Sequence, residues 1–143
     1  MPEEVELSPM EKKIIEHRTT GLSFCQISGD DLKHKIDQLI LRASAIVGCP
    51  LPNTEFFADI MTDEIITFVR EFGYSELTIS EILFALRVNA KGGLKYPTGA
   101  DVEQIPFSGN YFNVDYFSKV LSNYFIIRRI FDRKLENYLD GYK

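Results

Sequence analysis

The chain has 143 residues, of which 45% are hydrophobic and 13% aromatic, a composition typical of one folded domain and not of a disordered segment. Acidic residues outnumber basic ones by 21 to 16, and the net charge of −5 disfavours nonspecific nucleic-acid binding by the molecule as a whole. The charge is uneven, because residues 113–143 hold 4 acids and 6 bases. A basic face near the C-terminus therefore remains available to a partner.

The residues that usually bind metals or cofactors are few. Cys25 and Cys49 are the only cysteines and form no CxxC motif, and His17 and His34 lie far apart in the sequence. We expect two reduced thiols rather than a disulfide, and no metal or cofactor. The acidic N-terminus lacks the apolar segment of a signal peptide, and no apolar run approaches the about 18–20 residues of a membrane span. These features indicate a cytoplasmic protein that does not enter the membrane.

The first predicted helix begins after Ser8. We expect residues 1–7 to be flexible. Ser8 is a capping residue, Pro9 suits the first helical position, and Glu11 places an acid in the first turn. This helix is predicted to run to about Arg18 and to be followed by a loop.

Two amphipathic helices come next. The second helix follows Asp30 and Asp31 and ends at Gly48, and the third is capped by Asn53 or Thr54 and ends at Gly73. The apolar stripe of the second helix is Leu32, Ile36, Leu39, Ile40, Ala43, Ile46 and Val47. That of the third helix is Phe57, Ile60, Met61, Ile65, Phe68, Val69 and Phe72.

The last two helices are separated by a long connector. Thr78 and Glu81 form a capping box for the fourth helix, which should bury Ile79, Ile82, Leu83, Leu86 and Ala90. Residues 92–112 hold four glycines and two prolines, and connectors of this length are usually functional or partly structured. Asn113 caps a final helix to Asp140, whose stripe is Phe117, Val120, Leu121, Tyr124, Ile127, Phe131, Leu135 and Tyr138.

These elements predict an all-α fold. Residues 1–143 would form a single domain of about five helices in a small orthogonal array or bundle, with no strand and no internal repeat. The glycine-rich connector would lead into the long C-terminal helix. Most of the aromatic side chains of that helix follow the spacing of a core stripe, so we expect them to be buried.

Residues 68–91 have the layout of a helix-turn-helix. A DNA-reading helix would carry polar and basic side chains near its start, but Arg87, Asn89 and Lys91 come late, and Glu81 near the start would repel phosphate. Ordinary helix packing is therefore favoured, with DNA recognition as the alternative.

No catalytic or phosphate-binding signature is present. The stretch from Lys91 to Gly99 is rich in glycine and lysine but lacks the spacing of a phosphate-binding loop. Neither histidine has an evident catalytic partner, and Asp59, Asp63 and Glu64 are interpreted as a solvated acidic face rather than a metal site. We predict no catalytic residues.

A cluster of bases occupies the second half of the last helix: Arg128, Arg129, Arg133 and Lys134. Arg129 and Arg133 lie on one face, with Asp132 and Glu136 each three residues further along from one of them. Pairing within the helix would neutralise part of the cluster, and the remainder would face an acidic partner or a nucleic-acid backbone.

Several short motifs follow one another between Gly48 and Tyr124: Gly48-Cys49-Pro50-Leu51-Pro52, Leu77-Thr78-Ile79-Ser80-Glu81-Ile82 with Ala85, Asn89-Ala90-Lys91-Gly92-Gly93, Phe112-Asn113, and Tyr116-Phe117-Ser118-Lys119-Val120 with Tyr124. In this ordered set, which covers about half of the chain, the sequence resembles a group of small helical proteins of unsettled function encoded by phages and mobile elements of the Bacteroidetes. Residues 1–47 lie outside the resemblance. In size and layout the group is similar to small phage replication proteins that load or inhibit the replicative helicase.

The resemblance implies a non-enzymatic protein-binding adaptor that assists DNA replication in the cytoplasm of a bacterial host, with the replicative helicase as its partner. The residues predicted to contact that partner are Arg87, Asn89, Lys91, Tyr96, Arg128, Arg129 and Arg133. Two alternatives remain open at this point: a helix-turn-helix-like DNA-binding protein, and a virion-associated structural protein whose last helix packs between subunits.

Overall fold

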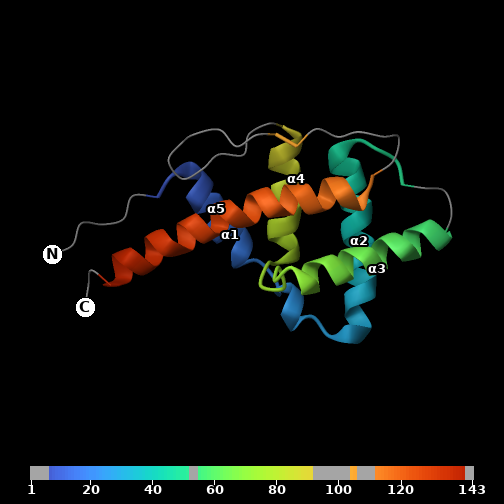
Figure 1. The fold of residues 1–143 in the computed structure, drawn as a ribbon, viewed down its shortest axis with the longest axis horizontal. Coiled ribbons are helices and arrows are strands. Elements are labelled where there is room, and N and C mark those ends of the chain that lie inside the picture. The colour runs from blue at the N-terminus through green and yellow to red at the C-terminus, as the bar shows by residue number, and fades with distance from the viewer. Residues whose placement is uncertain (1–6, 52–54, 92–103, 106–111, 141–143) are drawn as a thin grey trace.

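The computed structural model describes residues 7–51, 55–91, 104–105 and 112–140, without the side chains of residues 55–58, 135 and 137–140. Within these ranges the chain is helical and contains no strand (Figure 1). The elements are α1 (Pro9–Arg18), the short 3₁₀ helix η1 (Phe24–Gln26), α2 (Gly29–Val47), α3 (Glu55–Glu71), α4 (Ile79–Ala90) and α5 (Val114–Asp140). The all-α prediction is confirmed.

Local capping interactions determine where the helices begin. Ser8 and Glu11 form a reciprocal capping box at the start of α1, and Thr78 and Glu81 form the same box at the start of α4. Asn113 Oδ1 accepts a 2.9 Å hydrogen bond from the Tyr116 amide at the start of α5. These three predicted starts are confirmed.

The second predicted helix start is slightly wrong, because α2 begins at Gly29, ahead of the two aspartates expected to precede it. The helix ends as predicted at Gly48, which has the positive φ of 79° that favours glycine. The predicted α3 caps, Asn53 and Thr54, lie outside the described residues, as do residues 1–6 and most of the 92–112 connector.

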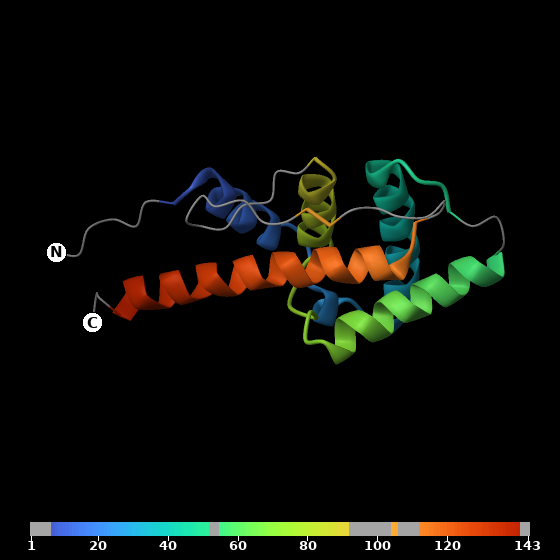
Figure 2. The ribbon, with the colours of Figure 1, turned by 45° about the horizontal axis from the view of Figure 1, so that its top comes forward.

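The helices form two layers. In both ribbon views α3 and α5 lie in front of α2 and α4, and α1 lies next to α4 (Figures 1 and 2). The C-terminal half of α5 continues past α4 and α1. Residues far apart in sequence are thereby brought together, since α5 contacts both α4 and the end of α3.

The core lies between the two layers. It contains the predicted stripe of α2 from Leu32 to Ala43 and that of α5 as far as Phe131, together with Ile14 of α1 and Phe112. Ile46 and Val47, at the end of the α2 stripe, are partly buried against it. Three side chains predicted to face the core are instead exposed: Ile60 at 43%, Phe72 at 63%, and Ala90. Ile60 points away from the buried side of α3, Phe72 follows the last residue of α3, and Ala90 is the last residue of α4.

The loop between α1 and α2 contributes to the core in a way that the helical pattern did not predict. Phe24 and Ile27 are buried, and the amides of Phe24 and Cys25 donate 2.8 Å hydrogen bonds to the carbonyls of Leu77 and Ser75. The turn that precedes α4 is therefore held by a segment about fifty residues earlier in the chain. Among the described residues, none of the helices is both long and apolar enough to cross a bilayer.

Candidate functional site

Four bases were predicted to form one cluster on α5, but Arg128 belongs to the core. Its side chain is about 6% exposed, and its Nε donates a 2.9 Å hydrogen bond to Oε2 of the fully buried Glu81. Tyr124 donates to the same oxygen at 2.5 Å, and the Thr78 amide donates to the other oxygen at 3.2 Å. Because this carboxylate is removed from water, it requires these partners, and Arg128 is its counter-charge.

Lys134 is also engaged within the protein. Its ammonium lies 2.8 Å from Oε1 of Glu11, a fully buried side chain of α1. Burial raises the pKa of Glu11, but the hydrogen bonds from Lys134 and Ser8 and the charge of Lys134 outweigh it, so the pKa falls below its usual 4.5. The pair attaches the second half of α5 to α1.

Arg129 and Arg133 are the two arginines of the cluster that remain exposed. The predicted pairing of these arginines with Asp132 and Glu136 does not form: within the described ranges neither guanidinium has an ion-pair partner. Asp132 instead binds Arg18 of α1 at 2.8 Å. Arg129 lies over the ring of Phe125, with its Cζ 6.0 Å from the ring centroid.

Apolar side chains lie beside these two cations. Ile126 is 50% exposed and Ile130 is 39% exposed. Residues three and four apart are neighbours on a helix surface, so Ile126, Arg129, Ile130 and Arg133 form one continuous face. We call these four residues the α5 outer face.

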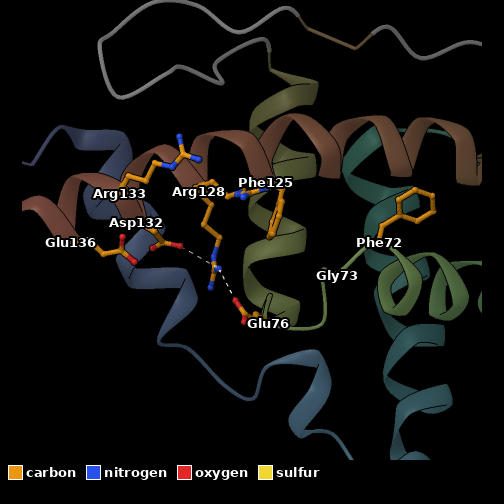
Figure 3. Close-up of a pocket in the computed structure, with 9 residues that line it drawn as sticks. Phe72, Gly73, Glu76, Phe125, Arg128, Asp132, Arg133 and Glu136 are labelled. Atoms are coloured by element: carbon orange, nitrogen blue, oxygen red, sulfur yellow. Dashed lines mark ion pairs between the residues drawn. The ribbon is translucent and has the colours of Figure 1, made fainter.

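A groove of about 520 Å³ borders the α5 outer face (Figure 3). It lies between the turn that follows α3, with Phe72 and Glu76, and the side of α5 from Phe125 to Glu136. Arg128 reaches into it from α5, and its Nη1 atom lies 3.8 Å from both Glu76 and Asp132. Phe72 is the most exposed of the large apolar side chains described, at 63%, and its ring packs 5.0 Å from that of Phe68.

The predicted contact residues of α4 do not line this groove. Arg87 and Lys91 are exposed, whereas Asn89 is only 1% exposed. The Asn89 amide group donates to Tyr116 Oη at 2.8 Å and to the Ile105 carbonyl at 3.2 Å, and its Oδ1 accepts from the Ile105 amide at 3.0 Å. Asn89 thus joins part of the connector to the core. Tyr96 lies outside the described residues.

His17 has a partner that sequence reasoning missed. Its Nδ1 lies 2.8 Å from Ser80 Oγ, and its ring stacks on Phe84 with centroids 4.6 Å apart. Burial lowers the pKa of His17, because it disfavours the imidazolium. Ser80 is 63 residues away in sequence, so no local pattern indicates the contact.

Asp59, Asp63 and Glu64, the acids considered for a metal site, are exposed on α3. In the part of the chain that the structure describes, no three His, Cys, Asp or Glu side chains come together as a metal site would require.

The fold and site define a single all-helical domain with a mixed-charge groove beside an exposed face of its longest helix. Comparison with protein-family models, with curated protein sequences and with solved structures yields no match to this chain.

Proposed function

We propose that the chain is a non-enzymatic protein-binding adaptor whose partner contacts the α5 outer face and the adjoining groove. The observation that carries the proposal is the position of Arg129 and Arg133: they have no ion-pair partner among the described residues, and exposed apolar side chains lie on either side of them. Arginine and aromatic residues are enriched at protein interfaces and among the residues that contribute most to binding.

The charges around the groove favour a protein over a nucleic acid. Its lining holds three guanidiniums and three carboxylates, the latter from Glu76, Asp132 and Glu136. A nucleic-acid backbone is bound by an excess of positive charge, and carboxylates at the same place repel it. A protein segment with its own mixed charges and an apolar side chain matches this lining better.

The helix-turn-helix alternative has weaker support. Residues 81–86 of α4 are consecutively buried, so the first two turns of the helix offer little surface to a DNA groove. A recognition helix contacts base edges mainly through its N-terminal residues. Arg87 and Lys91, at the exposed end of α4, are placed for accessory contacts rather than for base reading.

The specific role that we propose is assistance to DNA replication in the cytoplasm of a bacterial host that carries the phage or mobile element, with the replicative helicase as partner. This part rests on the resemblance of residues 48–124 to small phage and mobile-element proteins, and on their similarity in layout to helicase loaders and inhibitors.

Affinity capture from host cells that carry the element tests this role. The wild-type chain should recover the replicative helicase, identified by mass spectrometry, and R129E/R133E should lose it. K35E/R42E, which reverses two exposed cations on α2, is the matched control and should retain it. Recovery of no replication protein by the wild-type chain contradicts the replication role, and detection of the chain in purified particles would instead support a virion-associated protein.

A further inference from the structure

We propose that two copies of this chain form a symmetric dimer in which the α5 outer face of each copy packs on the outer side of α3 of the other. The inference goes beyond the adaptor function, because it concerns what covers the α5 outer face when no other partner is bound.

The outer side of α3 carries the opposite charge to the α5 outer face. Asp63, Glu64 and Glu71 are exposed there, and none of them has an ion-pair partner within the described ranges. Ile60 lies on the same side and is 43% exposed. Arg70 is the one base in the second half of this exposed side.

The two faces complement each other in chemistry. One presents two guanidiniums beside two isoleucines, and the other presents three carboxylates beside one isoleucine. Opposite charges steer the encounter and determine which surfaces meet, while the apolar side chains contribute buried area. Within one molecule the two faces do not satisfy each other, since the ion pairs of the described residues include none between them.

The arrangement of the helices allows both contacts to form at once. α3 and α5 pack against each other in the same layer, on the same side of the molecule (Figures 1 and 2). A two-fold axis that lies in the interface, parallel to that layer and midway between the two faces, places α5 of each copy on α3 of the other. Such an interface is closed, so the expected product is a dimer and not a filament.

Self-association and partner binding would share Arg129 and Arg133, and would therefore compete. The acids of α3 separate the two proposals, because they belong to the dimer interface and not to the groove. A D63K/E64K variant should lose self-association and keep partner capture, so failure of one proposal can be recognised without failure of the other.

Sedimentation velocity of the purified full chain, at low and at high salt, tests the dimer. We expect a dimer at low salt whose dissociation constant rises at least about fivefold in 0.5 M NaCl, since salt screens exposed charges. R129E/R133E and D63K/E64K should each raise the dissociation constant at least about tenfold, because each places like charges opposite one another. The K35E/R42E control should leave it unchanged.

The quadruple variant R129E/R133E/D63K/E64K provides the decisive measurement. It exchanges the charges of the two faces, so the dimer should return with a dissociation constant within about threefold of wild type. All four side chains are exposed, and unchanged helical circular dichroism would show that the variants are folded. A wild-type chain that stays monomeric at about 0.2 mM in low salt overturns the proposal, as does a dimer insensitive to either double reversal.

Discussion

The hydroxyl group of Tyr124 donates a 2.5 Å hydrogen bond to Oε2 of Glu81 and so connects α5 to α4 inside the core. Both side chains are fully buried. Burial, together with the negative charge of Glu81, raises the pKa of Tyr124 far above its usual value, so the phenol remains a donor throughout the accessible pH range. Arg128 supplies the positive charge that balances the carboxylate.

We expect the Y124F substitution to lower the free energy of unfolding by about 1.5–3 kcal/mol, because the ring still fills its site but the buried carboxylate loses a donor. Urea denaturation followed by circular dichroism measures the change. Y74F is the matched control: the Tyr74 hydroxyl makes a 3.2 Å contact with Ser122 at a part-buried site, and its loss should cost about 1 kcal/mol or less. Equal losses in the two variants would contradict a special role for the Tyr124–Glu81 bond.

Substitution of two neighbouring arginines of α5 should lower the stability of the protein by very different amounts. R128M leaves the buried carboxyl group of Glu81 without its counter-ion, and should reduce stability by about 3–5 kcal/mol. R129M changes an exposed side chain that lies over the ring of Phe125, and should cost less than about 1 kcal/mol. Thermal and urea denaturation of both variants provide the comparison.

A second substitution identifies the cause. If the loss in R128M comes from the unbalanced carboxylate, then E81Q in the R128M background should recover part of the lost stability. A double variant less stable than R128M alone would exclude the charge-balance explanation and favour loss of packing by the long arginine side chain.

The starts of α1, α4 and α5 were predictable because the signals that specify them are local. Ser8 with Glu11, and Thr78 with Glu81, lie three residues apart and act within one turn. The same locality explains what was missed. The capping role explains from the sequence why a glutamate stands at position 81, but it does not indicate that this side chain is buried. The partners that balance it in the core, Tyr124 and Arg128, are 43 and 47 residues away in sequence.

The candidate site was predictable only in part, for the same reason. Spacing within α5 pointed to Asp132 as a partner of Arg129, but the structure pairs it with Arg18, 114 residues earlier. The consequence is a division of the basic cluster: Arg128 and Lys134 neutralise buried carboxylates, while Arg129 and Arg133 remain exposed. Phe72 was assigned to the core stripe because helical spacing does not reveal that α3 ends at Glu71.

His17 should make the stability of the protein depend on pH in the range just below neutrality. Burial is the largest influence on its pKa and lowers it below the usual 6.5, so the folded state binds this proton less readily than the unfolded chain does. The contribution of His17 to the free energy of unfolding is therefore complete above about pH 6.5. It is lost as the pH falls through the lower pKa that His17 has in the folded protein.

The H17Q substitution should flatten the dependence of the free energy of unfolding on pH between about pH 7 and pH 5. Urea denaturation at several pH values measures the slope. H34Q changes an exposed histidine of α2 and serves as the control. A slope that H17Q leaves as steep as in wild type, or that H34Q flattens to the same degree, would show that another group titrates.

Asn89 was predicted to contact a partner, and its buried position leads to a different expectation. Its amide satisfies the Ile105 backbone and the Tyr116 hydroxyl, so N89A should leave buried polar groups unpaired and reduce stability by about 1–3 kcal/mol. The Ile105 amide should also exchange its hydrogen faster, because that amide donates to the Asn89 side chain. K91A, at the exposed end of α4, should change neither quantity measurably. If N89A instead kept wild-type stability and exchange but lost partner capture, Asn89 would be an interface residue and the connector would be held by other contacts.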